Sequence, residues 1–156
     1  MQDVRQKLRL TRRDSLSLGA AAVAFAAMPR TAQAQTLEKA MAEIEAFTGG
    51  AEAQRGKVSL DLPEIAENGN AVPLVVSVAS PMTADDFVEK IIVVTSANPL
   101  ARALAASFTP LSGRAELTTR IRLAATQEVF AVARTHAGQF FMDSRVVKVT
   151  IGGCGG

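Results

Sequence analysis

The sequence of 156 residues has few of the residue types on which most catalytic and metal sites depend. It contains one cysteine, Cys154, and one histidine, His136. A single cysteine cannot form an internal disulfide, so the fold must be stabilised by packing. A single histidine leaves no histidine and cysteine cluster with metal-ligand spacing and no Ser-His-Asp set. We interpret His136 as an exposed residue of a hairpin turn, and the sequence predicts no active site of its own.

Three other features that can carry function have simpler interpretations here. Gly49-Gly50 follows a predicted helix instead of opening one, which excludes a phosphate loop. Asp85-Asp86 lies in a predicted turn, and no second acidic pair completes a metal site. Arg114, Arg120 and Arg122 lie on one face of a predicted strand. We expect that face to be solvated or to line an interface, with an anion or partner site as the alternative.

Residues 1–34 have the organisation of an export signal rather than of a folded element. A basic start precedes the Ala-rich stretch Leu16–Met28, which has 13 residues and is too short to span a membrane. Ala32-Gln33-Ala34 matches a small-x-small cleavage site, with the cut expected before Gln35. The residues of the basic start are Arg5, Lys7, Arg9, Arg12 and Arg13.

The export motif resembles a twin-arginine signal. Arg12 and Arg13 form the arginine pair, although Ser15 stands where the pattern prefers phenylalanine. A general secretory signal is the alternative, and a cytoplasmic amphipathic N-terminus is a third interpretation. We therefore expect a periplasmic protein with no stable membrane insertion after the signal is removed.

The predicted signal also accounts for the basic character of the whole chain. The first 34 residues hold six of the 17 Lys and Arg and two of the 15 Asp and Glu. Their removal leaves 11 positive and 13 negative side chains, so the net charge changes from +2 to −2. A nucleic-acid-binding function thereby loses its main support. The remaining 122 residues suffice for one domain with one core.

The body of the chain is predicted to contain one helix followed by short strands. Thr36 is the expected helix cap, Gly49-Gly50 the end, and the apolar stripe comprises Leu37, Met41, Ile44 and Phe47. Alternating and β-branched runs predict strands at Lys57–Leu62, Val72–Ala79, Val88–Thr95, Ala101–Phe108, Arg114–Leu123, Val129–Ala133 and Val146–Ile151. We interpret residues 65–70 as a turn, and Gln139–Met142 as a segment that pairs back after the hairpin.

About seven strands with turns every 8 to 12 residues predict a mainly β fold, a β-sandwich with a short N-terminal helix. The immunoglobulin-type cysteine pair and tryptophan are absent, so a barrel remains the alternative. In either fold the last predicted strand leads directly into Gly152-Gly153-Cys154-Gly155-Gly156.

This glycine-rich tail is the one feature of the chain that points to chemistry. Glycine has no Cβ and adopts φ of either sign, so little side-chain bulk surrounds the thiol. Five residues beyond Ile151 reach about 17 Å when extended, at about 3.3 Å each. An incidental cysteine at a loose chain end is the alternative. We interpret Cys154 as a reactive or intermolecular thiol, because glycines supply no neighbours to bury it.

Nothing in the tail activates the thiol. The tail has no Lys, Arg or His, and the carboxylate of Gly156 disfavours the thiolate by like charge. We hypothesise that the thiol depends on the enzyme pocket that receives it. An iodoacetamide titration that gave a thiol pKa well below that of free cysteine would contradict this hypothesis.

The terminal Gly-Gly-Cys-Gly-Gly motif resembles that of the SoxY family, the sulfur carriers of bacterial thiosulfate oxidation. Other segments resemble the family in the same order, from Thr36 to Gly156: Ile65–Gly69, Val72-Pro73, Asn98-Pro99, Phe108–Pro110, Ser112-Gly113 and Thr119–Arg122. The resemblance implies an immunoglobulin-like β-sandwich over residues 35–151 and a carrier arm over residues 152–156. It implies that Cys154 is the covalent attachment point for sulfur, flanked by Gly152, Gly153, Gly155 and Gly156.

The resemblance also implies a set of partners. It implies a heterodimer with SoxZ and transient contacts with the SoxXA cytochrome, the SoxB hydrolase and, where present, a sulfane dehydrogenase. The chain itself would be a non-catalytic carrier without an intrinsic cofactor, holding an S-thiosulfonate or persulfide on Cys154.

Two interpretations from other classes stay open. A terminal Gly-Gly also ends ubiquitin-like sulfur carriers, in which the carboxylate of Gly156 would become a thiocarboxylate. Alternatively, Cys154 would tether an exported structural subunit by a disulfide. Prenylation is excluded because only two residues follow the cysteine.

Overall fold

The computed structural model describes residues 32–152, which contain one α-helix, one short 3-10 helix and eight strands. The elements are α2 (Ala32–Thr48), β1 (Val58–Asp61), β2 (Ile65–Asn68), β3 (Val72–Val78), β4 (Val88–Thr95), β5 (Arg102–Ser107), η1 (Pro110–Ser112), β6 (Ala115–Ile121), β7 (Gln127–Thr135) and β8 (Phe140–Ile151). The predicted export residues Arg12 and Arg13 lie outside the described residues, as do Gly153, Cys154, Gly155 and Gly156.

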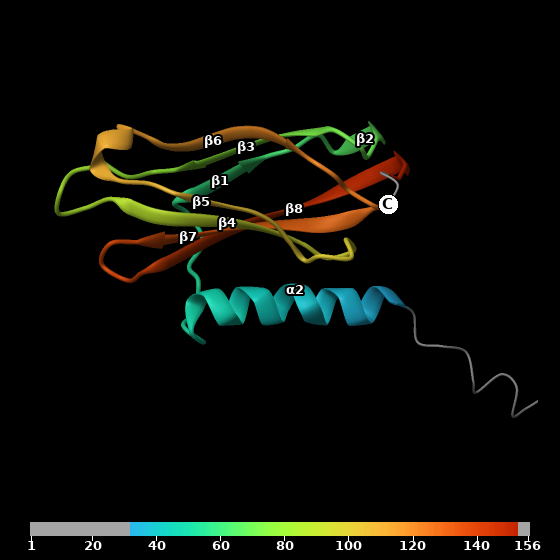
Figure 1. Ribbon diagram of the computed structural model, residues 1–156, viewed down its shortest axis with the longest axis horizontal. Coiled ribbons are helices and arrows are strands. Elements are labelled where there is room, and N and C mark those ends of the chain that lie inside the picture. Colours follow the sequence, from blue (N-terminus) through green and yellow to red (C-terminus); the bar gives the residue numbers. More distant parts are fainter. Residues whose placement is uncertain (1–31, 153–156) are drawn as a thin grey trace, which may run out of the picture. The chain divides into compact units, whose positions relative to one another are not determined.

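The strands form two separate sheets, which Figure 1 shows as stacked layers with α2 as a third layer. One sheet has the order β1-β3-β6, and the other has the order β2-β8-β7-β4-β5. Neighbouring strands are antiparallel, except that β2 runs parallel to β8. The predicted immunoglobulin-like β-sandwich is confirmed, and the barrel alternative is wrong because the two sheets do not close on each other.

The main core lies between the two sheets and follows from alternation along the strands. In β3 every second residue is buried, and Leu74 and Val76 are fully inaccessible to solvent. Val129 on β7 and Val147 on β8 meet them in the same cluster from the other sheet. Full burial of such an aliphatic side chain contributes about 1.5–3 kcal/mol. Packing of this kind provides the stability that a chain with one cysteine must obtain without an internal disulfide.

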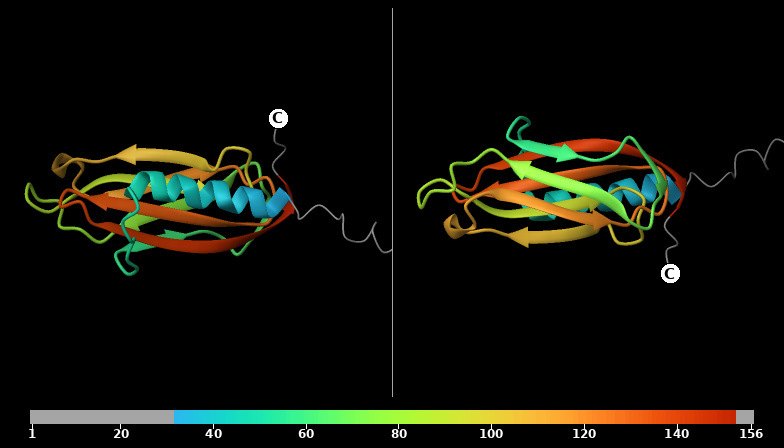
Figure 2. Two further views of the ribbon diagram at one scale, coloured as in Figure 1. Left: turned by 90° about the horizontal axis from the view of Figure 1, so that it is seen from below. Right: turned by 90° about the horizontal axis from the view of Figure 1, so that it is seen from above.

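The helix covers the outer face of the five-stranded sheet and creates a second core. Ala40 and Ile44 of α2 pack there with Ile92 and Val94 of β4 and Phe130 of β7. Figure 2 shows α2 running along the strands of this sheet. Because apolar residues are needed on both faces, residues 91–94 of β4 form an unbroken apolar run, and their predicted burial on both faces is confirmed.

The helix differs from its prediction in its start and its buried face. It begins at Ala32 rather than at a Thr36 cap, and it ends before Gly49-Gly50 as predicted. Leu37 and Met41 of the predicted stripe are exposed. Ile44 and Phe47 of the predicted stripe do pack on the sheet, together with Ala40, whose small side chain lets the helix approach the sheet closely.

Two strand predictions are wrong for identifiable reasons. Residues 65–68 of the segment interpreted as a turn form β2, in which Ala66 is the one buried residue, so no apolar alternation marks it; Gly69 and Asn70 do form a turn. The segments predicted at Gln139–Met142 and Val146–Ile151 are parts of one strand, β8. The polar residues Asp143, Ser144 and Arg145 interrupt the apolar pattern of β8 without interrupting its backbone pairing with β7.

These polar residues close the edge of β1. The carboxylate of Asp143 accepts a hydrogen bond from the Leu60 N–H at 3.2 Å, and Arg145 donates to the Leu60 carbonyl at 3.4 Å. Arg55 lies 3.6 Å from the same carboxylate. Side chains that occupy the backbone groups of an edge strand keep other strands from pairing there.

Candidate functional site

The site begins where β8 ends, because this strand leads into the glycine-rich tail. β7 pairs with β8 from Phe140 to Val147, and β2 pairs with it from Lys148 to Ile151. Figure 1 shows β2 beside the final part of β8. Without β2, the last four residues of β8 would extend beyond the sheet without a neighbouring strand.

Backbone hydrogen bonds continue this support up to the last residue of the strand. The N–H of Gly69 donates to the carbonyl of Ile151, and the N–H of Leu123 donates to the carbonyl of Gly69, both at 2.8 Å. On the other side of β8, the N–H of Val149 donates to Oγ1 of Thr126 at 3.0 Å. The turn after β2 and the loop after β6 therefore both hold the end of β8.

Gly152 occupies a position that no other residue fits without movement. A Cβ added there would lie 2.2 Å from the carbonyl oxygen of Ala124, a backbone atom. From the sequence, this glycine was explained only by the lack of side-chain bulk around the thiol. The structure adds that Gly152 lies against the loop after β6, so this first residue of the tail is in contact with the sandwich.

An amide pair connects the loops around this position. Oδ1 of Asn98 accepts from the Ala124 N–H and from Nε2 of Gln127, both at 2.9 Å, and Nδ2 of Asn98 donates to the Arg122 carbonyl at 2.8 Å. Oε1 of Gln127, whose residue is 3% exposed, accepts from the Ala97 N–H at 2.8 Å. These bonds fix which way each amide points, because every oxygen faces donors.

His136 lies apart from these loops, in the turn between β7 and β8. Its ring stacks on Phe87 with centroids 4.7 Å apart, and Nδ1 lies 3.2 Å from a carboxylate oxygen of Glu89. Its side chain is 53% exposed, which confirms the prediction of an exposed turn residue. Arg114, Arg120 and Arg122 are exposed, as the solvated-face interpretation requires.

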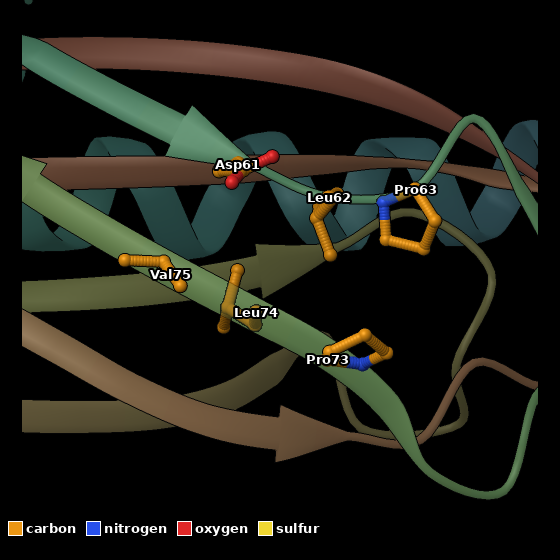
Figure 3. Close-up of a pocket in the computed structure, with 6 residues that line it drawn as sticks. All are labelled: Asp61, Leu62, Pro63, Pro73, Leu74 and Val75. Carbon is orange, nitrogen blue, oxygen red and sulfur yellow. The ribbon is translucent and has the colours of Figure 1, made fainter.

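A shallow hollow of about 300 Å³ opens where β1 separates from β3 (Figure 3). Its lining comes from the end of β1 and the start of β3 and is mostly apolar, with Asp61 as the charged residue: Asp61, Leu62, Pro63, Pro73, Leu74 and Val75. One carboxylate among aliphatic side chains has no second polar group to activate it and forms no acid and base pair. The hollow therefore carries no evident reaction.

Two further properties hold for residues 32–152. In that range, no group of three or more His, Cys, Asp or Glu side chains is placed to hold a metal ion. Within the same range, no helix combines the length and apolar character needed to cross a bilayer.

Sequence reasoning missed the residues that organise this end of the sandwich. Asn98 was named only as part of the family-like segment Asn98-Pro99, and Gln127 had no assigned role. A signal was present in each case, because amide side chains beside buried strands usually have hydrogen-bond partners. Those partners are 24 to 30 residues away along the chain, so no local pattern identifies them.

Comparison with known proteins gives a family match and a close structural relative. The family described as "Sulfur oxidation protein SoxY" matches residues 44–154. The sulfur carrier protein SoxY from Chlorobium limicola f thiosulfatophilum is similar in structure, with a TM-score of 0.61 and 30% sequence identity. The match covers 73% of this chain and 98% of the other. No curated protein matches the chain.

More distant structures share only the fold. A superoxide reductase (neelaredoxin) from Ignicoccus hospitalis has a TM-score of 0.55 and 16% identity, with 60% of this chain and 80% of that chain covered. A hypothetical protein from Pyrococcus horikoshii OT3 has a TM-score of 0.50 and 9% identity, with 63% and 91% covered. At such identities the likeness concerns the β-sandwich and not its chemistry.

Proposed function

This chain belongs to the SoxY family, and we propose on that premise that it is a sulfur carrier that binds sulfur covalently at Cys154. The observation that carries the proposal is the family match, which extends through residue 154 and so includes the one cysteine of the chain. The proposed organisation is an export signal at residues 1–34, the sandwich domain at 35–151 and the carrier arm at 152–156.

The anchored base of the arm supports a carrier that works at short range. Because Gly152 lies against Ala124, two residue steps separate the last supported position from Cys154. Two extended residues span about 7 Å, at about 3.3–3.6 Å each. A partner enzyme must therefore bring its reacting groups close to the loops around Gly152 in order to reach the thiol.

In the proposed cycle, thiosulfate joins Cys154 through its sulfane sulfur. The S–H bond breaks and an S–S bond forms, while a proton goes to solvent and two electrons go to a c-type haem protein of the SoxXA kind. Water then attacks the terminal sulfone in a SoxB-type hydrolase. The bond between the sulfane sulfur and the sulfone breaks, sulfate and a proton leave, and a persulfide stays on Cys154.

A second round returns the free thiol. Where a sulfane dehydrogenase is present, three waters supply oxygen to the outer persulfide sulfur, six electrons pass to the dehydrogenase and protons pass to solvent. A second hydrolysis releases sulfate and restores the Cys154 thiol. In this proposal the carrier catalyses none of these steps and has no cofactor of its own. The proposed compartment is the periplasm, reached through the Arg12-Arg13 signal, and the proposed stable partner is SoxZ.

Intact mass spectrometry tests the proposal. The chain and its partner are incubated with thiosulfate and a periplasmic extract, and we expect a thiosulfonate or persulfide adduct that a Cys154→Ser variant lacks. A double variant, Cys154→Ser with Leu111→Cys, places a thiol on a side chain that is 96% exposed in η1. This relocated thiol should react with iodoacetamide and yet acquire no adduct from the extract.

The other outcomes separate the alternatives. An adduct that persists in the Cys154→Ser variant would contradict attachment at Cys154. An adduct located on Gly156 would favour the thiocarboxylate carrier. A reducible dimer without any adduct would favour the disulfide tether.

A further inference from the structure

Because the proposed arm is short, the direction in which it leaves the sandwich decides which groups of a partner can reach Cys154. The residues around Gly152 bear on that direction. The carbonyl of Ala124 lies where a Cβ on Gly152 would be, so the position of this carbonyl limits the path of the chain after β8. The loop after β6 therefore lies directly beside Gly152, the first residue of the arm. Whatever fixes that loop also fixes the side toward which the arm can leave.

Asn98 fixes this loop at two backbone positions on either side of Leu123. Its amide donates to the Arg122 carbonyl and accepts from the Ala124 N–H, at 2.8 and 2.9 Å. Leu123 between them is fully buried, and its N–H bonds to Gly69, which in turn donates to Ile151. One side chain from the β4–β5 connection thus holds the two peptide groups that come directly before the Ala124 carbonyl.

Gln127 keeps the Asn98 amide in the orientation that this arrangement requires. Nε2 of Gln127 donates to Oδ1 of Asn98, and a flipped Asn98 amide would present a donor to that donor. Gln127 is itself held by the Ala97 N–H. Ala97 and Asn98, which are neighbours in the β4–β5 connection, are thus both hydrogen-bonded to Gln127 at the start of β7.

We propose that Asn98, oriented by Gln127, is a positioning residue for Cys154: it holds the loop after β6 against Gly152 and sets the direction in which the carrier arm leaves the sandwich. This inference rests on the proposed carrier function, because direction matters only if partner enzymes must reach the thiol. Asn98 acts through the backbone of residues 122–124 and does not itself touch the sulfur.

The control must separate positioning from stability, and the opposite end of the sandwich offers one. Thr135 is 4% exposed, and its Oγ1 accepts from the Gln139 N–H at 3.1 Å and lies 3.4 Å from the Gln139 carbonyl. A Thr135→Val variant loses buried loop hydrogen bonds as Asn98→Ala does, but far from β8's last residue. Asn98→Asp keeps the acceptor oxygen and loses the donor to Arg122, so it serves as the milder variant should Asn98→Ala fold poorly.

Two rates are compared for the unaltered chain and each variant. Alkylation of Cys154 by iodoacetamide should change less than about twofold, because a small reagent needs no defined approach. Loading from thiosulfate in the extract should fall about tenfold or more in Asn98→Ala, since a misplacement of about 1 Å can cost up to ~10²-fold in rate. Asn98→Asp should lie between, and Thr135→Val should load at the unaltered rate. Unchanged loading in Asn98→Ala, or an equal loss in Thr135→Val, would overturn the proposal.

A second measurement does not depend on the carrier function. A nitroxide on Cys154 and another on Leu111→Cys give a distance distribution by pulsed electron paramagnetic resonance. This distribution should broaden in Asn98→Ala and stay unchanged in Thr135→Val. An unchanged distribution in Asn98→Ala would refute the positioning role, even if no loading were observed. If the unaltered chain acquires no adduct while the distribution does broaden, the carrier function fails and the control of direction stands.

Discussion

The two ends of the sandwich are built from similar loops but are held together differently. At the end that bears the arm, side-chain hydrogen bonds join segments 24 to 30 residues apart, with Asn98 and Gln127 at their centre. At the opposite end, side-chain hydrogen bonds such as those of Thr83 to Asp86 and Thr135 to Gln139 span three or four residues. Two connections are joined there as well: the N–H of His136 donates to the Phe87 carbonyl at 2.9 Å, and its partly exposed ring contacts Phe87 and Glu89.

Hydrogen bonds between loops show how a small domain without an internal disulfide can hold the base of a glycine-rich tail in place. A loop that closes on itself can shift without moving its neighbours. Loops that bond to one another move together or not at all, so their shared position is defined by several strands. The glycine-rich tail begins at the end where the Asn98 and Gln127 amides bond the loops to one another.

The largest effect is expected from breaking the core beneath the arm-bearing end. Leu123→Ala removes a fully buried side chain and should lower the free energy of unfolding by about 2–5 kcal/mol. Leu111→Ala at the opposite end alters a side chain that is 96% exposed and should change it by less than about 0.5 kcal/mol. Urea denaturation measures both, and similar losses for the two variants would remove the contrast.

The next effect comes from the amide pair. Gln127→Leu leaves the Ala97 N–H without its acceptor, and we expect a loss of about 1–3 kcal/mol, the range for a buried group left unsatisfied. Hydrogen exchange should accelerate at Ala97 and Ala124 and stay unchanged at Asp86. The matched control, Gln139→Leu, makes the same change on an exposed residue of the opposite end and should leave exchange at Ala124 unaltered. Slow exchange at Ala97 in Gln127→Leu would show that other contacts hold the loop.

A smaller effect on stability is expected at the base of the arm. Gly152→Ala places a Cβ against the Ala124 carbonyl, and we expect a loss of about 1 kcal/mol, the lower end for overpacking, because few residues follow. Loading of Cys154 should nevertheless fall, as the arm is pushed from its path. Gly138→Ala, at φ 75° in the opposite turn, should cost about 1–2 kcal/mol of backbone strain and leave loading intact. Loading that followed stability in both variants would contradict a defined path.

The smallest effect is expected from the one histidine. His136→Ala removes the stack on Phe87, and we expect a loss of about 0.5 kcal/mol, the lower end for an aromatic pair, because the ring is half exposed. Thermal unfolding measures this change. Iodoacetamide alkylation and thiosulfate loading of Cys154 should match the unaltered chain, and a loss of loading would give His136 a role that its position does not suggest.

Much of the fold was predictable because its strands carry their own pattern. The prediction for β4 matches its observed bounds, that for β3 is one residue too long at its end, and that for β1 is one residue too long at each end. β2 was missed because it is held by parallel pairing with β8 and shows no apolar face. The exposed Leu37 and Met41 could not be recognised from helical spacing, because the sheet decides which stripe is covered.

The candidate site divides in the same way. The tail was recognisable because its residues are adjacent in the chain and unlike the rest. Asn98, Gln127 and Gly69 were not, because their roles exist only through partners brought together by folding. Local composition thus singled out the tail, whereas the long-range bonds at its base required the structure.

The change of neighbour along β8 has a mechanical consequence. A partner that draws the arm away along the strand axis loads the β2 and β7 hydrogen bonds in shear, so that many must stretch together. A pull across the strand would instead open them one at a time, beginning with the bond from Gly69 to Ile151. The sandwich should therefore resist tension applied along β8 far better than tension applied across it, so that a pull along this strand would leave the two sheets folded.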